Sequence, residues 1–172
     1  MFVTSAEANK KLKKLDTELK ELEQKEAKSS VFNAASGEDE DKIRPEYDFK
    51  TVQARIMSIQ GKIIQLKEKI SRFNLETNLD DYGFDLSIME ALVYLPLLSK
   101  RVMTLQKMAS LLPRERATSY GYGTNNVIDY RIANYDISEV QTEYSKEADR
   151  LSKLQIAIDT VNNTVKGIEM PD

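Results

Sequence analysis

The chain has 172 residues, of which 31% are charged and 41% hydrophobic, and its formal net charge is −3 at pH 7. This balance is typical of a single globular domain, and it gives no electrostatic case for binding nucleic acid or an anionic membrane through overall charge. The chain contains no Cys and no His. Disulfides, thiol nucleophiles, thiolate metal sites and imidazole bases are therefore excluded. Composition alone does not exclude a site in which carboxylates bind a hard metal ion.

Targeting and membrane segments are not predicted. The first eleven residues become strongly charged after Phe2 and Val3, which is unlike a signal peptide. No run reaches the roughly 18 apolar residues of a spanning helix. The most apolar run, 91–98, contains Pro96 and leads into Lys100 and Arg101. We therefore expect a cytoplasmic protein with no membrane span.

The first predicted helix covers residues 5–28. Leu12, Leu15, Leu19 and Leu22 follow one another at spacings of 3, 4 and 3, so they share one helical face. Residues 29–45 then become small, polar and acidic, with the run 38–41 carrying four carboxylates. Such a segment buries little apolar surface, which predicts a flexible loop. The run lacks the ligand spacing of a calcium loop, so we expect no metal site there.

The strongest pattern in the chain predicts a helix over residues 46–74. Its apolar residues alternate spacings of 3 and 4 over four heptads, which is the signature of a coiled-coil helix that packs against a partner helix. The predicted seam consists of Phe49, Val52, Ile56, Ile59, Ile63, Leu66, Ile70 and Phe73.

A third helix is predicted over residues 86–112, after a turn over 75–85 in which Asn78 or Gly83 takes a positive φ and Asp85 is the N-cap. Its apolar stripe is wide, which indicates more than one neighbour. Pro96 lies well inside it and is expected to kink or split the helix.

Residues 116–133 change to a period of two and predict a small β-hairpin. A polar and aromatic cluster gathers there, and it is the best candidate for a partner surface: Arg114, Arg116, Tyr120, Tyr122, Tyr130 and Arg131. Arginine interleaved with tyrosine could stack on nucleic-acid bases or on a protein partner. The alternative is that the tyrosines form a local core where helix meets hairpin.

The last predicted helix covers residues 136–168, with Asp136 at its N-cap and Gly167 at its end. Its apolar residues again alternate spacings of 3 and 4, and the centre of this second seam is Leu151, Leu154, Ile158 and Val161. Two long helices with similar seams are natural partners. We therefore expect helices 46–74 and 136–168 to pair, with 5–28 and 86–112 alongside them.

The predicted fold is thus a single domain over 1–172. It is mainly all-α, an elongated antiparallel helical bundle or coiled coil of about four helices with a β-hairpin inserted. Four apolar seams offer more surface than one chain hides. We therefore expect a homo-oligomer, most simply a two-fold dimer.

Several short motifs resemble a family of small uncharacterised bacterial helical proteins, some of which are labelled septicolysin-like. They are Ile70-Ser71-Arg72-Phe73-Asn74-Leu75-Glu76-Thr77, then Leu86-Ser87-Ile88-Met89-Glu90-Ala91-Leu92, and finally the stretch 149–162. The likeness covers about residues 50–163, and the chain departs from it at Pro96 and in its longer acidic loop. The resemblance implies a helical fold and supplies no established activity or catalytic residues.

The most favoured function is a non-catalytic, self-assembling coiled-coil protein that works by protein–protein interaction. The alternatives are a nucleic-acid-binding arm that uses the Arg- and Tyr-rich hairpin, and a membrane-associated, lysin-like protein that uses the apolar run 91–98. We expect no enzyme activity and no cofactor.

Overall fold

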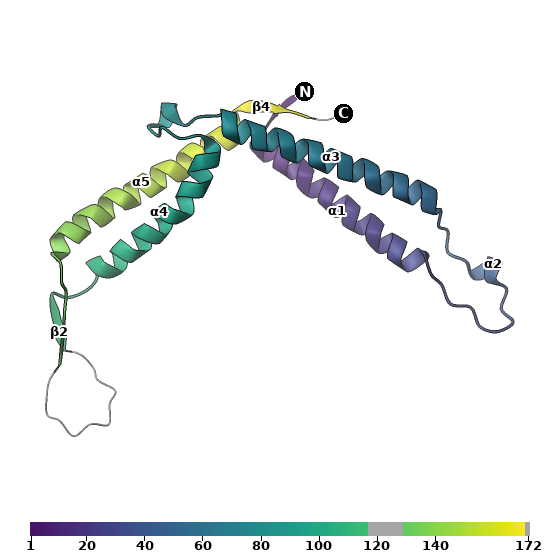
Figure 1. Cartoon of the computed structure of the whole chain (residues 1–172), viewed down its shortest axis with the longest axis horizontal. Coiled ribbons are helices and arrows are strands. Elements are labelled where there is room, and N and C mark those ends of the chain that lie inside the picture. Colours follow the sequence, from purple (N-terminus) through teal and green to yellow (C-terminus); the bar gives the residue numbers. More distant parts are fainter. Residues whose placement is uncertain (117–128, 171–172) are drawn as a thin grey trace, which may run out of the picture. The chain divides into compact units, whose positions relative to one another are not determined.

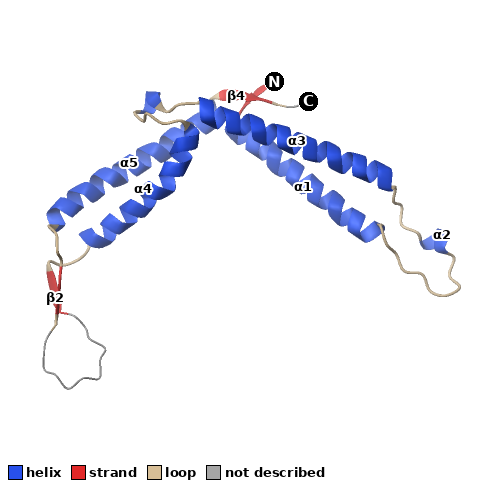
Figure 2. Cartoon of the chain, in the orientation of Figure 1, coloured by secondary structure: helices blue, strands red, loops and turns tan. Residues whose placement is uncertain are grey.

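The structure is a computed structural model that describes residues 1–116 and 129–170. It confirms a mainly α-helical chain of antiparallel helices with a small β-hairpin (Figures 1 and 2). Where the sequence predicts one domain, contacts divide the chain into two compact units, Met1–Thr77 with Thr160–Asp172, and Asn78–Asp159. The elements are β1 Phe2–Thr4, α1 Ser5–Ser29, α2 Glu40–Ile43, α3 Phe49–Glu76, a 3₁₀ turn Asp80–Tyr82, α4 Ile88–Ala109, β2 Arg114–Arg116, β3 Tyr130–Ile132, α5 Ile137–Thr164 and β4 Lys166–Glu169.

The first unit is built on a hairpin of two long helices, α1 and α3, which lie side by side (Figure 1). α1 begins with a capping box, in which Thr4 Oγ1 accepts from Glu7 N at 3.2 Å and Glu7 Oε2 accepts from Thr4 N at 2.9 Å. Most of the apolar seam of α3 is buried in this hairpin, together with Leu15 of α1. This burial is the main source of stability for two helices whose outer faces are highly charged.

The predicted pairing of helix 46–74 with helix 136–168 is therefore wrong. α3 packs along α1, and α5 has α4 beside it. Similar seams do not decide which helix is the partner, because any apolar stripe with a spacing of 3 and 4 fits any other. Sequence order favours these partners, because elements that follow one another along the chain usually lie adjacent in space.

Polar contacts fix the far end of the α1–α3 hairpin. Tyr47 donates its hydroxyl to Glu26 Oε1 at 2.8 Å, and Gln53 Nε2 donates to the same oxygen at 3.0 Å. The hydrogen bond to Glu26 raises the pKa of the Tyr47 phenol. Arg55 crosses from α3 to Glu18 of α1 at 2.8 Å. These contacts tie the chain on both sides of the acidic loop to the end of α1.

The acidic loop contains a short helix that the sequence does not predict. Asp39 is its N-cap, and Glu40 and Asp41 lie in its first turn. Carboxylates at this position are favoured by the helix dipole, so the acidic run stabilises one turn of helix instead of only repelling itself. Arg44 lies over the Phe32 ring at 5.6 Å and brings the two sides of the loop together.

A small sheet joins the two ends of the chain, and it corrects the end of the last helix. α5 ends at Thr164, and residues 166–169 form β4, which pairs antiparallel with β1; Val3 lies opposite Ile168. Both of these side chains are buried. The helical pattern of Val165 and Ile168 extends the prediction too far, because only the distant first strand makes the extended conformation favourable.

The second unit contains α4 and most of α5, which run antiparallel beside each other (Figure 1). Tyr135 donates its hydroxyl to the Met108 carbonyl oxygen at 3.0 Å, and Gln141 Nε2 donates to the Ala109 carbonyl oxygen at 3.4 Å, so both cap the end of α4. Near the middle of the pair, the Arg150 guanidinium lies 5.4 Å from the centre of the Tyr94 ring. Leu98, Val102 and Leu105 of α4 and Leu154 and Ile158 of α5 are buried.

The turn before α4 and the proline within α4 bear on three predictions. Gly83 has a φ of 82°, as the sequence predicts. Pro96 does not split α4, which runs unbroken from Ile88 to Ala109. The N-cap is Ser87 and not Asp85: Ser87 Oγ accepts from Glu90 N, and Glu90 Oε2 accepts from Ser87 N at 2.8 Å.

The capping box of α4 predicts a pH dependence of stability. Hydrogen bonds from the Ser87 backbone and side chain lower the pKa of Glu90. Its contribution is therefore fully present above the unfolded-state pKa and is lost as the pH falls through the lower folded-state pKa. In thermal denaturation, wild type should be more stable than Glu90→Gln at neutral pH, and the difference should shrink as the pH falls below the ordinary glutamate pKa of about 4.3. A difference in melting temperature that does not change with pH would contradict this.

Candidate interaction surfaces

The hairpin predicted to carry a partner surface is a two-stranded ribbon. Arg114 lies opposite Ile132, Glu115 opposite Arg131, and Arg116 opposite Tyr130. Because side chains alternate across a strand, Arg114, Arg116 and Tyr130 share one face of the ribbon, whereas Arg131 lies on the other. Tyr120 and Tyr122 lie outside the described residues.

Two of the three arginines of the ribbon are engaged with neighbouring groups. The Arg114 guanidinium lies 3.8 Å from the centre of the Tyr130 ring, and Arg131 forms an ion pair with Glu115 at 3.4 Å. Arg131 is therefore largely neutralised, and a strong phosphate-binding surface needs several uncompensated cations together. The other face of the ribbon stays available to a partner, and it carries two exposed guanidinium groups and an exposed phenol.

The predicted seam residues are mostly consumed inside the chain. Five residues of the first seam are buried (Ile56, Ile59, Ile63, Leu66 and Phe73), as are Leu154, Ile158 and Val161 of the second. Val52, Ile70 and Leu151 are half-buried, and Phe49, at the start of α3, is 61% exposed. The heptad pattern therefore identifies packing within the helix hairpins, and it does not mark the surface on which a second copy would dock.

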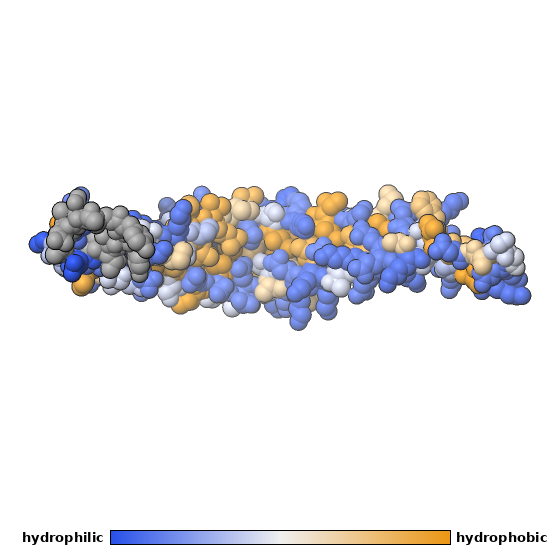
Figure 3. Space-filling model, turned by 90° about the horizontal axis from the view of Figure 1, so that it is seen from below, coloured by the Kyte–Doolittle hydropathy of each residue, from blue (hydrophilic) through white to orange (hydrophobic). Residues whose placement is uncertain are grey.

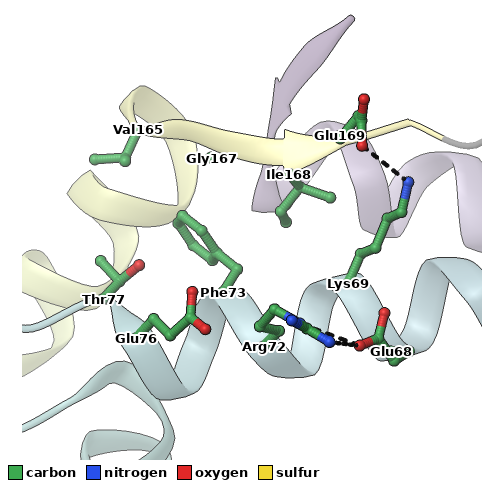
Figure 4. Close-up of a pocket in the computed structure, with 10 residues that line it drawn as sticks. All are labelled: Glu68, Lys69, Arg72, Phe73, Glu76, Thr77, Val165, Gly167, Ile168 and Glu169. Atoms are coloured by element: carbon green, nitrogen blue, oxygen red, sulfur yellow. Dashed lines mark hydrogen bonds and ion pairs between the residues drawn. The ribbon is translucent and has the colours of Figure 1, made fainter.

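A groove of about 560 Å³ lies between α3 and β4 in the first unit (Figure 4). Its floor includes Phe73, and its walls carry two ion pairs: Lys69 Nζ to Glu169 Oε2 at 3.4 Å, and Arg72 Nε to Glu68 Oε1 at 3.1 Å. The Glu68 carboxylate raises the pKa of Arg72. Each cation already has a carboxylate partner, so this groove has no unpaired cation with which to attract an anionic ligand.

Phe73 and Gly167 are in close contact in this groove, where the ring points toward the strand (Figure 4). A Cβ at position 167 would lie 2.6 Å from Cδ2 and Cε2 of Phe73, well inside van der Waals contact. Glycine is therefore required for β4 to pass over this ring. Its role is in packing, although the sequence suggested a helix end.

An unpaired apolar surface remains on α4, which we call the outer α4 face. Leu92, Val93, Leu97 and Met103 are 42%, 60%, 62% and 54% exposed, although all four are large and apolar. Pro96 is also exposed and Met89 is half-buried. The face thus consists of Met89, Leu92, Val93, Pro96, Leu97 and Met103. In the space-filling view of the whole chain, clusters of hydrophobic side chains reach the surface between hydrophilic ones (Figure 3).

The width of the α4 stripe was the signal for this surface. A helix with a single neighbour buries one stripe, and the sequence shows apolar residues extending well beyond one stripe. The sequence alone assigns the excess to additional neighbours in one bundle. Within the second unit α4 packs against α5, so the excess stays at the surface.

Two kinds of site can be assessed over residues 1–116 and 129–170. No group of three or more Asp or Glu side chains in these ranges is arranged to hold a metal ion. No helix there combines the length and the apolar character needed to cross a membrane.

Comparisons with known proteins establish the fold and leave the activity open. No family model matches the chain, and no curated protein matches it. The chain is similar to a crystal structure of a functionally unknown conserved protein from Corynebacterium diphtheriae, with a TM-score of 0.54 and 18% identity over 94% of this chain and 96% of that one. At this identity the likeness shows a shared fold alone. The resemblance to septicolysin-like proteins stays a prediction.

Proposed function

We propose that this chain is a non-catalytic interaction protein that assembles with itself through exposed helix faces. The observation that supports it is the outer α4 face, on which large apolar side chains are exposed at helical spacing. Scattered exposed apolar residues are normal on a protein surface, whereas a contiguous group on one helix is typical of an interface.

The chemical groups that the chain contains also support a non-catalytic role. The chain has no His and no Cys, and the groove between α3 and β4 carries two ion pairs. The described residues therefore offer another molecule an apolar surface on which to pack. The proposal differs from the sequence-based expectation in one respect, because the long heptad seams serve folding and the wide stripe of α4 serves assembly.

Nucleic-acid binding has weaker support. Arg114 and Arg116 share a face of the ribbon with Tyr130, but Arg131 is paired with Glu115, and the net charge of the chain is −3. A membrane-associated role would use the same outer α4 face, in which Lys100 and Lys107 interrupt the apolar surface. Self-assembly uses both the apolar groups and these lysines, as argued below.

Sedimentation velocity over a hundredfold range of protein concentration tests the proposal. The 19.7-kDa chain should shift toward twice that mass as concentration rises through the micromolar range. A single species of 19.7 kDa at every concentration would rule out self-assembly. Added RNA, DNA or anionic vesicles provide the comparison, and we expect the shift without any of them.

A further inference from the structure

We infer that the outer α4 face is the dimer interface, and that it packs on the same face of a second copy with the two α4 helices antiparallel and crossing near Pro96. This inference rests on the proposed self-assembly and specifies its surface, its partner and its orientation. Three features of α4 carry it: the spacing of its exposed residues, the distribution of its charges, and the position of its proline.

The exposed residues of α4 form a second seam with coiled-coil spacing. Met89, Val93, Pro96, Lys100 and Met103 follow one another at spacings of 4, 3, 4 and 3, and Lys107 continues the series. This spacing keeps all of them on one side of the helix, opposite the buried stripe of Leu98, Val102 and Leu105. α4 therefore presents one seam to α5 and another to solvent.

The charges on this seam select the antiparallel orientation. Lys100 and Lys107 both lie in the second half of the helix, whereas Asp85 lies just before its start. Parallel pairing would place each lysine opposite its own copy, and like charges across an interface are unfavourable. Antiparallel pairing moves the lysines of one copy toward the acidic start of α4 in the other. The helix dipoles also oppose each other favourably in that orientation.

A two-fold axis at Pro96 brings the apolar groups together. Residues equidistant from the axis then face each other, so Met89 meets Met103 of the second copy and Pro96 meets its own counterpart. The same axis places Lys107 beside the loop that contains Asp85. The outer α4 face thus carries both halves of a complementary pair. A two-fold symmetric interface requires this self-complementarity. A second copy of this chain is therefore the partner that best fits the face.

Disulfide trapping tests this arrangement cleanly, because the natural chain contains no Cys. In helices packed about 8–10 Å apart, facing Cα atoms come within about 3.5–5.5 Å, which overlaps the range that a disulfide bridges. Under mild oxidation, Pro96→Cys should form a covalent dimer. Ile64→Cys, at a 68% exposed position on α3, is the matched control and should stay monomeric on a non-reducing gel.

Orientation is read from a second pair of variants. Met89→Cys and Met103→Cys should each cross-link poorly alone, and a mixture of the two should cross-link at least about tenfold faster than either; parallel pairing predicts the reverse. If sedimentation shows that wild type is monomeric, the proposed function and this inference both fail. If wild type is a dimer but Pro96→Cys links no better than Ile64→Cys, or the mixture links no faster than its components, self-assembly stands and the outer α4 face is not the interface described here.

Discussion

Replacing Ile59 with Asp should unfold the α1–α3 hairpin, with a loss of at least about 4 kcal/mol in the free energy of unfolding. Ile59 is 5% exposed and lies in the middle of the seam that α3 buries. The substitution removes a buried branched side chain and leaves a carboxylate with no partner in an apolar environment. Urea denaturation followed by circular dichroism measures the loss.

Ile64→Asp provides the control in the same helix. Ile64 lies five residues away and is 68% exposed, so the same chemical change there should alter stability by no more than about 0.5 kcal/mol. The comparison also separates two interpretations of the heptad pattern. If the seam of α3 served assembly alone, Ile59→Asp would yield a folded monomer. A folded Ile59→Asp protein with wild-type stability would contradict the packing described here.

Gly167→Ala should destabilise the first unit by about 1–3 kcal/mol, because its methyl group needs space that the ring of Phe73 fills. The two nearest ring carbons lie 2.6 Å from the position of the new Cβ. Either β4 moves away from α3 or the ring rotates out of its buried position. The change should appear as a lower urea midpoint with an unchanged slope.

Gly61→Ala is the opposite case. Gly61 lies inside α3, and nothing lies within 4 Å of a Cβ added there. Alanine should therefore stabilise the helix by about 0.5–1 kcal/mol through its higher helix propensity. If both alanine variants changed stability in the same direction, the close contact between Phe73 and Gly167 would not be present in solution.

The four long helices were predictable from the sequence because each of them is encoded locally. The spacing of Ile56, Ile59 and Ile63 specifies both a helix and its buried face, and Gly83 marks a turn that needs positive φ. The alternation of apolar and polar residues around Tyr130 similarly located β3. Local spacing and turn chemistry were sufficient for these features.

The two largest errors concern contacts between residues distant in sequence. No local signal shows that Val3 pairs with Ile168, so residues 166–168 were assigned to a helix. The partner of α3 was also wrong, because heptad spacing describes a surface without naming what covers it. The same holds for the candidate interaction surface. The width of the α4 stripe is visible in the sequence, but the exposure of its outer residues depends on where α5 packs.

The central claim is that the outer α4 face holds two copies together, and the mass of Val93→Glu tests it most directly. Light scattering at about 100 µM, well above a micromolar dissociation constant, should give close to twice 19.7 kDa for wild type and 19.7 kDa for the variant. Ile64→Glu, at an equally exposed position on α3, should retain the wild-type mass. A Val93→Glu protein that keeps the dimer mass would contradict the account.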